Sequence, residues 1–145
     1  MTVSIYLYTD IKGPRRKDGT AMYVLEAVKD DKTVTRTGMV HIEKTTSMEA
    51  ELRALRTASE RFTKSCSVLV FTECAGISAA YKNGWLKRWK ENGWKTAKGQ
   101  PVAHAEDWEV IDRILGDGVE VHLGEKHSYL SWMESEVHRW NTQRQ

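Results

Sequence analysis

The segment NGWLKRWKENGWKTAKG, residues 83 to 99, is the most informative stretch of this chain, because it places three tryptophans among lysines and arginines. From residue 82 to residue 98, six bases accompany one acid, Glu91, so this segment alone carries +5 (6 − 1), whereas the formal net charge of the whole chain is +2. The charge is therefore concentrated in one patch. A basic patch of this kind predicts a polyanionic partner.

The rest of the composition narrows the class of protein. A chain of 145 residues is the size of one domain, and we expect a single domain over residues 1–145. No apolar run approaches the roughly 20 residues of a membrane-spanning helix, and residues 1–20 lack the pattern of a signal peptide. Cys66 and Cys74 lack the spacing of a zinc site, which predicts a cytoplasmic protein with two free thiols. We expect a monomer that does not bind membranes.

The amino-terminal third predicts an antiparallel meander. Residues 3 to 8 alternate between aliphatic and other side chains, the period of a strand, and this strand ends at Asp10. Two further strands are expected at residues 22–28 and 33–42, joined by an Asp-Asp turn. Asp10 is therefore expected at the carboxyl edge of a sheet.

The remainder of the chain alternates between helices and strands. Thr45 to Ser47 offer N-caps for an amphipathic helix at residues 48–62. Residues 67–71 have the composition of a strand buried on both faces, and Glu73 follows it. The other elements expected are helices at residues 75–81, 102–115 and 128–140 and a strand at residues 119–123. The expected order is βββαβααβα.

Four pieces of this sequence together resemble the type 1 ribonuclease H family. They are YLYTD, ending at Asp10; AELRAL, around Glu51; VLVFTE, ending at Glu73; and GWLKRWKENGWKTAKGQPVAHAEDW, beginning at Gly84. The last piece resembles the basic handle of the family, which we define here as residues 82–100. The resemblance implies an α/β fold, with a five-stranded mixed sheet in the order 3-2-1-4-5 and helices on both faces.

In that family the basic handle lies against nucleic acid, which explains its composition. Cations favour approach to a chain of phosphates, and aromatic rings pack on sugars or bases. Trp85 and Trp89 are four residues apart, so they share a helical face and at least one is expected to anchor the handle in the core. The alternative is a Trp-anchored surface helix with solvated lysines. The residues expected to contact nucleic acid are Lys12, Thr46, Ser47, Trp85, Lys87, Arg88, Lys90 and Lys95.

The resemblance also implies a catalytic set of four acidic metal ligands. Asp10, Glu51 and Glu73 match the first three, and Glu134, on the last helix, is expected to be the fourth, with Glu136 as the alternative. Two Mg²⁺ ions held by such oxygen ligands can activate water and neutralise a phosphodiester, and Mn²⁺ is the alternative cation. Each residue taken alone also has an ordinary interpretation as a solvated acid.

Two of the four candidate metal ligands have longer side chains than the family's residues at the same positions. The family has Asp, Glu, Asp and Asp, whereas Glu73 and Glu134 replace the last two. A Glu carboxylate reaches roughly 1.5 Å further than that of Asp. A metal site tolerates a displacement of its ligand atoms of about 0.5 Å. A displacement of about 1 Å can lower the catalytic rate on the order of a hundredfold. The longer side chains are therefore expected to strain or enlarge the site.

Other parts of the family pattern are altered as well. The Gly-Asn-Pro-rich loop becomes IKGPRRKDG at residues 11–19, and the paired Asn before the helix becomes Ser47-Met48. His127 keeps its place before the final helix, outside the usual Gly-His context. It is either a proton shuttle or product-release aid, or an inert surface histidine.

Two functions of different classes follow from this pattern. The first is a metal-dependent endoribonuclease that hydrolyses the RNA strand of RNA–DNA hybrids. The second is a catalytically impaired domain of the same fold that binds hybrid or double-stranded RNA. Every candidate ligand position is still acidic, which favours the enzyme. A protein-interaction domain without a nucleic-acid role would leave the basic handle unexplained.

Overall fold

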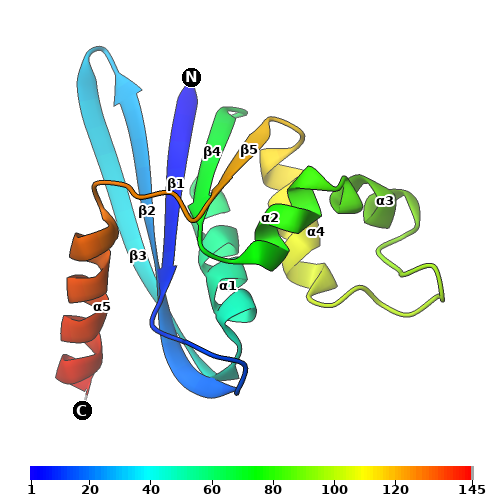
Figure 1. Cartoon of the computed structure of the whole chain (residues 1–145). Coiled ribbons are helices and arrows are strands. Elements are labelled where there is room, and N and C mark those ends of the chain that lie inside the picture. Colours follow the sequence, from blue (N-terminus) through cyan, green and yellow to red (C-terminus); the bar gives the residue numbers. More distant parts are fainter. Residues whose placement is uncertain (145) are drawn as a thin grey trace.

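The computed structural model describes residues 1–144, and it contains one five-stranded sheet and five helices (Figure 1). The strands are β1 (Thr2–Thr9), β2 (Lys17–Lys29), β3 (Lys32–Thr45), β4 (Ser67–Thr72) and β5 (Val119–Leu123). The helices are α1 (Ser47–Ser59), α2 (Ala75–Lys82), α3 (Trp85–Glu91), α4 (Ala105–Leu115) and α5 (Leu130–Arg144).

The strand order is β3-β2-β1-β4-β5, which confirms the predicted sheet. β1 is antiparallel to β2 and parallel to β4, with Tyr6 opposite Phe71. Because parallel neighbours end at the same edge of a sheet, the chain leaves β1 at Asp10 and β4 at Glu73 close to each other. The topology therefore provides the shared edge that the predicted site requires.

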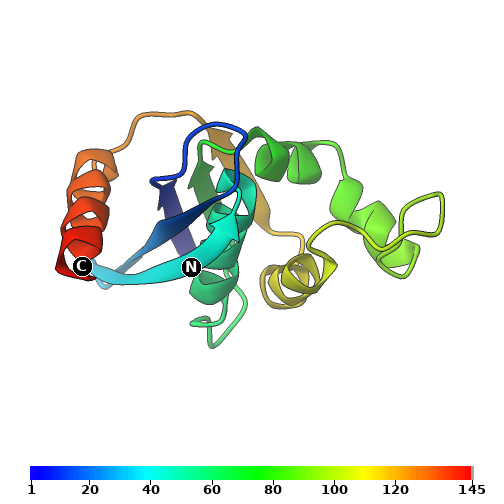
Figure 2. The ribbon, with the colours of Figure 1, turned by 90° about the horizontal axis from the view of Figure 1, so that it is seen from below.

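The two faces of the sheet are covered by different helices, as predicted (Figures 1 and 2). Ile5 and Leu7 point to the face covered by α1 and belong to the larger buried core. Tyr6 points to the opposite face and belongs to a second cluster with Met133 and Val137 of α5. The period of two in β1 thus divides the core into two layers.

Helix α1 forms for local reasons that the sequence anticipated. The hydroxyl of Thr46 accepts a hydrogen bond from the backbone N–H of Glu49 at 3.2 Å and caps the helix. Leu52 and Leu55 are fully buried along its apolar face. Burial of this stripe fixes which way the helix faces, and it directs Glu51 towards β4.

Several predicted bounds were wrong. β2 begins at Lys17 instead of residue 22, because its pairing with β3 continues past a bulge between Lys17 and Gly19. α4 begins at Ala105 instead of residue 102, since His104 has a left-handed backbone (φ 59°) just before it. α5 is displaced to residues 130–144, and so its last turn reaches further along the chain than the sequence predicted.

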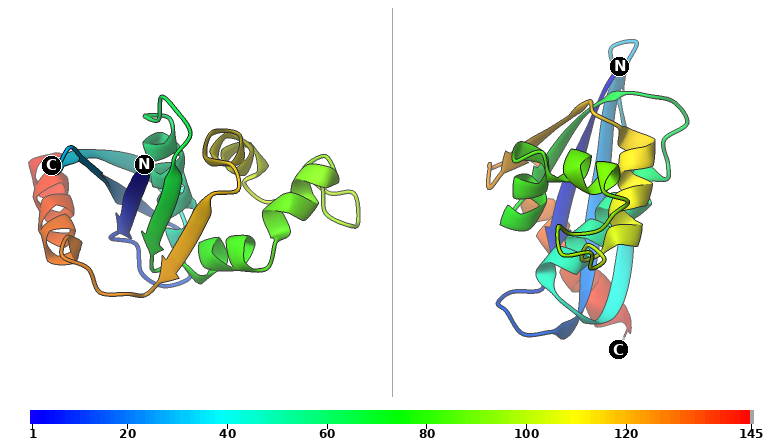
Figure 3. Two further views of the ribbon diagram at one scale, coloured as in Figure 1. Left: turned by 90° about the horizontal axis from the view of Figure 1, so that it is seen from above. Right: turned by 90° about the vertical axis from the view of Figure 1, so that its right-hand side faces the viewer.

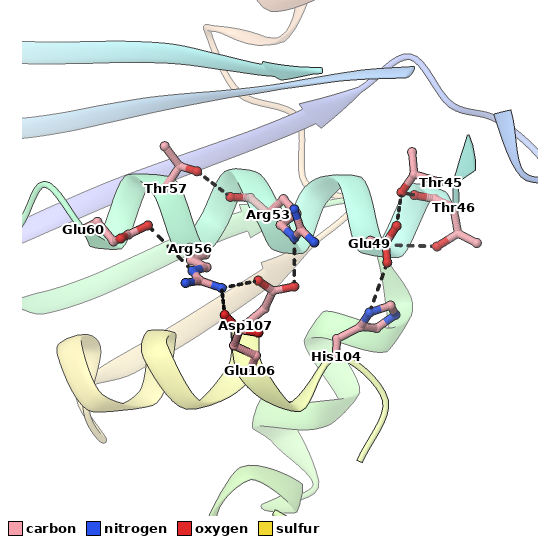
Figure 4. A network of polar contacts seen from close by, with 10 residues as sticks. All are labelled: Thr45, Thr46, Glu49, Arg53, Arg56, Thr57, Glu60, His104, Glu106 and Asp107. Atoms are coloured by element: carbon pink, nitrogen blue, oxygen red, sulfur yellow. Dashed lines mark hydrogen bonds and ion pairs between the residues drawn. The ribbon is translucent and has the colours of Figure 1, made fainter. Parts of the chain in front are cut away.

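A polar network fastens α4 to α1 (Figure 4). The buried carboxylate of Asp107 accepts from Arg53 at 3.2 Å and from Arg56 at 2.9 Å. Near the start of α4, Nδ1 of His104 lies 3.4 Å from a carboxylate oxygen of Glu49. The helix that follows the basic handle, α4, is therefore joined to α1, the helix that carries Glu51.

No helix among residues 1–144 is long and apolar enough to cross a membrane. Cys66 and Cys74 are both free thiols and both are half-buried.

Candidate active site

The candidate active site lies where β1 and β4 end. We define the acidic edge as Asp10, Glu51, Glu73 and Glu134. Asp10 and Glu73 follow the two parallel strands, Glu51 comes from α1, and Glu134 comes from α5. The fold therefore brings all four predicted carboxylates to one end of the sheet, although not to one point.

Glu51 and Glu73 share one depression of about 210 Å³. Lys12 and Ser47, two of the residues predicted to contact nucleic acid, also line it. The depression lies between the loop after β1, the start of α1 and the start of α2. It is polar and open, as a site for part of a charged polymer has to be.

Glu51 is the buried member of the set, with 4% of its surface exposed. The hydroxyl of Thr72 donates a hydrogen bond of 2.6 Å to Oε1 of Glu51. Burial raises the pKa of Glu51 to about 7, the Thr72 hydroxyl opposes that rise, and the charge of Glu73 adds to it. Near neutral pH this carboxyl group is therefore present in both protonation states.

Asp10 faces a different direction. Its Oδ1 accepts a hydrogen bond from the backbone N–H of Thr20 at 3.0 Å, and its Oδ2 accepts one from the amide of Asn141 at 2.7 Å. Asp10 lines a second depression, of about 450 Å³, between β2, β3 and the end of α5. It is absent from the lining of the depression that Glu51 and Glu73 share.

Glu134 is exposed on the second turn of α5. Burial raises the pKa of Tyr8, and the charges of Glu134, Asp10 and Glu73 raise it further, so the charges of all three acids reach this tyrosine. Glu136 instead forms an ion pair of 2.6 Å with Arg139. Of the two acids considered for the fourth position, Glu134 is the one whose charge reaches the acidic edge.

The acidic edge offers suitable donors for a divalent cation but does not form a closed site as it lies. Carboxylate oxygens are the ligands that hard cations prefer. Among residues 1–144, however, no three His, Cys, Asp or Glu side chains are grouped so that they could hold one ion. Asp10 lines the other depression, where both its oxygens accept hydrogen bonds, and does not line the one that Glu51 and Glu73 share.

His127 lies at the same end of the sheet, above Tyr6, with ring centroids 4.6 Å apart. Its Nδ1 accepts a hydrogen bond from the backbone N–H of Tyr129 at 3.2 Å, so the neutral ring carries its proton on Nε2. Burial lowers the pKa of His127, and the charge of Glu73 opposes that shift. His127 is therefore neutral at pH 7 and within electrostatic reach of the acidic edge.

The residues at the start of α1 divide into two kinds. The hydroxyl of Thr46 is engaged as the N-cap of α1, whereas Ser47 lies on the shared depression. Lys12 is exposed, and its Nζ lies 5.2 Å from the centroid of the Tyr8 ring. The charge of Lys12 also lowers the pKa of Glu51, which places its ammonium near the carboxylates.

The basic handle projects beyond the edge of the sheet as α3 and the loop after it (Figures 2 and 3). Trp89 packs against the core, and its ring centroid lies 6.1 Å from that of the fully buried Trp108. Trp85, in contrast, is 37% exposed. The expected anchor is therefore Trp89, and Trp85 is left on the surface.

The bases of the basic handle are not equivalent. Lys87, Arg88 and Lys95 are exposed, and the guanidinium of Arg88 donates to the carbonyl oxygen of Asn83 at 2.6 Å. Lys90 lies 3.4 Å from the carboxylate of Asp112 and is thus already paired. Trp85, Arg88 and Lys95 border a hollow of about 360 Å³ on the handle.

A family model described as RNase H matches residues 3–128. The chain belongs to the ribonuclease H family. This agrees with the fold, with the acidic edge and with the basic handle described above.

Among curated members of the ribonuclease H family, the ribonuclease H of Bradyrhizobium sp. (strain ORS 278) is 41% identical over 71 residues, which cover 49% of this chain and 46% of that protein. The ribonuclease H of Neisseria gonorrhoeae is 28% identical over 118 residues, covering 80% of this chain and 77% of that protein. The first of these alignments therefore spans about half the length of the relative.

Solved structures of the ribonuclease H family share the fold. LC9-RNase H1, described as a type 1 RNase H with the type 2 active-site motif, superposes with a TM-score of 0.72 at 19% identity over 95% of this chain and 71% of that one. The foamy viral protease-reverse transcriptase in complex with RNA/DNA hybrid gives a TM-score of 0.66 at 16% identity, over 94% of this chain and 18% of that one.

Within this ribonuclease H domain, four residues that contact or adjoin the acidic edge were not predicted from the sequence. Thr72 donates a hydrogen bond to Glu51, Tyr8 lies within reach of the charges of the acids, and Thr20 and Asn141 both donate hydrogen bonds to Asp10. Thr72 was visible as the residue before Glu73 at the strand end. Asn141 carried no signal in the sequence, because 131 positions separate it from Asp10 and no local pattern links the two residues.

Proposed function

We propose that this ribonuclease H domain hydrolyses the RNA strand of RNA–DNA hybrids in a reaction that depends on a divalent cation, Mg²⁺ or Mn²⁺. The observation that carries the proposal is the parallel pairing of β1 with β4, which brings Asp10 and Glu73 to the same edge of the sheet, where Glu73 shares a depression with Glu51. Membership of the ribonuclease H family supports the same conclusion. A bound divalent cation would supply charge neutralisation at the phosphodiester.

The residues of the chain have separate parts in this proposal. Glu51 and Glu73 present their carboxylates to the shared depression, and Lys12 lies beside them with a charge that attracts phosphate. Ser47 offers a hydroxyl at the same depression. A phosphate of the substrate would thus approach a site where one cation of the protein is already present.

His127 is suited to carry a proton near this site. Its lowered pKa keeps the ring neutral at pH 7, so it can accept a proton, and the charge of Glu73 stabilises the ring once it is protonated. The hydrogen bond from Tyr129 and the contact with Tyr6 fix its orientation. A proton released as the phosphodiester is cleaved could therefore leave the depression through His127.

The basic handle would hold the hybrid. Lys87, Arg88 and Lys95 are free to approach phosphates, and the exposed face of Trp85 can pack on a sugar or base. The handle and the acidic edge are joined by α2, whose N-cap residue Cys74 lines the depression and whose last residue, Lys82, belongs to the handle. One hybrid could therefore contact both.

A second candidate is a domain that binds hybrid or double-stranded RNA without cleaving it. The orientation of Asp10 favours this candidate, since its carboxylate is held away from Glu51 and Glu73. Both candidates use the basic handle in the same way, so binding alone does not separate them.

A cleavage assay distinguishes the enzyme from the binding domain. A hybrid whose RNA strand is labelled at its 5′ end is incubated with the protein in Mg²⁺, Mn²⁺ or EDTA, and the fragments are resolved by length. We expect cleavage in either cation that is lost with EDTA and with Asp10→Asn. If wild type and Asp10→Asn are equally inactive while both bind the hybrid, the binding domain replaces the enzyme.

A further inference from the structure

Three residues from distant parts of the chain form a closed set of hydrogen bonds at the end of β1. The hydroxyl of Thr20, on β2, donates to Oδ1 of Asn141 at 2.6 Å. The amide of Asn141, on α5, donates to Oδ2 of Asp10 at 2.7 Å. The backbone N–H of Thr20 then donates to Oδ1 of Asp10 at 3.0 Å.

The chemistry of the three groups fixes the direction of each bond. An ionised carboxylate can only accept hydrogen bonds, so the NH₂ group of Asn141 has to face Asp10. The carbonyl oxygen of Asn141 then faces the hydroxyl of Thr20, which donates to it. Asn141 therefore presents a donor to Asp10, and its own oxygen is occupied.

The packing of α5 delivers Asn141 to this position. Met133 and Val137 are almost completely buried against the sheet, and Asn141 follows Val137 by four residues on the same helical face. Asn141 lies in the last turn of α5, beyond the buried side chains of Met133 and Val137. Figure 1 shows that this end of α5 is the carboxyl-terminal end of the ribbon. Terminal turns with few buried contacts open at low free-energy cost.

These contacts hold Asp10 on the wrong side for a shared cation. Its carboxylate lines the depression between β2, β3 and the end of α5, with Asp18 and Glu43, and not the depression that contains Glu51 and Glu73. The hydrogen bond from Asn141 holds the carboxylate of Asp10 in this orientation. The acidic edge therefore lacks a closed cation site while Asp10 is held in the second depression.

We propose that Asn141 is a positioning residue that competes with a divalent cation for Asp10. This inference rests on the proposed dependence on a divalent cation. For Asp10 to share a cation with Glu51 and Glu73, its carboxylate would have to turn away from the second depression, and that turn would break the hydrogen bond from Asn141. Thr20 is the anchor that keeps Asn141 aimed at Asp10.

The competition has a reciprocal consequence. If the last turn of α5 weakens cation binding, then the cation weakens the attachment of that turn by the same factor. Amide hydrogens near Asn141 should therefore exchange faster in the presence of Mn²⁺. The amides around the buried Met133 should not change.

The test uses Mn²⁺ alone, without nucleic acid, and follows its binding by calorimetry. Asn141→Ala removes the competing donor and should bind Mn²⁺ roughly tenfold more tightly than wild type. Thr20→Val keeps the shape of the buried side chain, removes the anchor and should shift affinity in the same direction. Glu134→Gln, which removes an acid on the same helix, should not tighten binding.

Hydrogen exchange supplies the second readout. Wild type should lose protection in the last turn of α5 when Mn²⁺ is added, and Asn141→Ala should show little further change. Equal or weaker Mn²⁺ binding by both Asn141→Ala and Thr20→Val, or no binding by any of the proteins, overturns the proposal. Hybrid cleavage is a separate measurement, because competition for Asp10 can hold in a domain that does not cleave.

Discussion

The hydroxyl of Thr72 donates a hydrogen bond of 2.6 Å to Oε1 of Glu51, and both residues are buried. The bond stabilises the ionised carboxylate, but burial outweighs it and raises the pKa of Glu51 to about 7. The buried acid of the site is therefore poised between two protonation states, and its environment sets the balance.

The stability of the metal-free protein should depend on pH through Glu51. Between the ordinary value of 4.5 and about 7, the folded protein binds more protons at this residue than the unfolded chain does. The free energy of unfolding should therefore fall as pH rises through that window, by roughly 3 kcal/mol in total. Glu51→Gln should lack this loss, so its stability relative to wild type should increase from pH 4.5 to 7.

The measurement is urea unfolding in EDTA at several pH values, with Glu134→Gln as the matched control because Glu134 is exposed. Parallel pH profiles for wild type and Glu51→Gln would contradict the raised pKa.

The lengths of Glu73 and Glu134 should appear in the choice of cation. Mn²⁺ tolerates irregular geometry better than Mg²⁺, which demands nearly ideal octahedral coordination. We expect wild type to cleave hybrid faster in Mn²⁺ than in Mg²⁺, at saturating hybrid. Glu73→Asp, alone or with Glu134→Asp, should reduce the ratio of the two rates. An unchanged ratio in both variants would show that these side chains do not set the geometry of the site.

The two tryptophans of α3 should respond differently to removal. Trp85→Ala should lower hybrid affinity about fivefold or more, because stacking on one base contributes about 1–3 kcal/mol, with little change in melting temperature. Trp89→Ala should instead lower the melting temperature, since Trp89 packs against the core beside Trp108. Fluorescence anisotropy and thermal unfolding of both variants decide this, and the reverse pattern would exchange the roles of the two rings.

The lysines of the basic handle should contribute unequally to the salt dependence of hybrid binding. Lys87→Gln should reduce the dependence of log affinity on log salt by somewhat under one unit. Lys90→Gln should reduce it less, because Lys90 is paired with Asp112. Affinity measured across a salt series for both variants provides the comparison. Identical slopes of log affinity against log salt for the two variants would show that the ion pair with Asp112 does not reduce the contribution of Lys90 to binding.

One buried hydroxyl should be dispensable. The hydroxyl of Tyr81 is buried without a hydrogen-bond partner among the described residues, while the ring packs edge-on against Trp108. Tyr81→Phe should therefore stabilise the fold by about 1 kcal/mol, since it removes an unpartnered polar group and keeps the ring. Tyr23→Phe is the control and should destabilise, because the Tyr23 hydroxyl accepts a hydrogen bond from Arg61 at 2.6 Å. Urea unfolding gives both values.

The sequence by itself determined the sheet and the place of the acids along it. The alternation before Asp10 and the buried run before Glu73 are local patterns that predict two strands, each followed by an acid. The resemblance to the ribonuclease H family then implied the strand order and the helices on both faces, which the fold confirms. The spacing of Trp85 and Trp89 likewise predicted that at least one of them anchors the handle.

Only the tertiary structure decided how the side chains at that edge are directed. The burial of Glu51 depends on α1 packing over β4, and the orientation of Asp10 depends on Asn141 of α5, which lies 131 positions later in the chain. Local periodicity carries no information on such contacts, because they arise when independent elements pack together. The acids could therefore be named from the sequence, whereas their pKa values and partners required the fold.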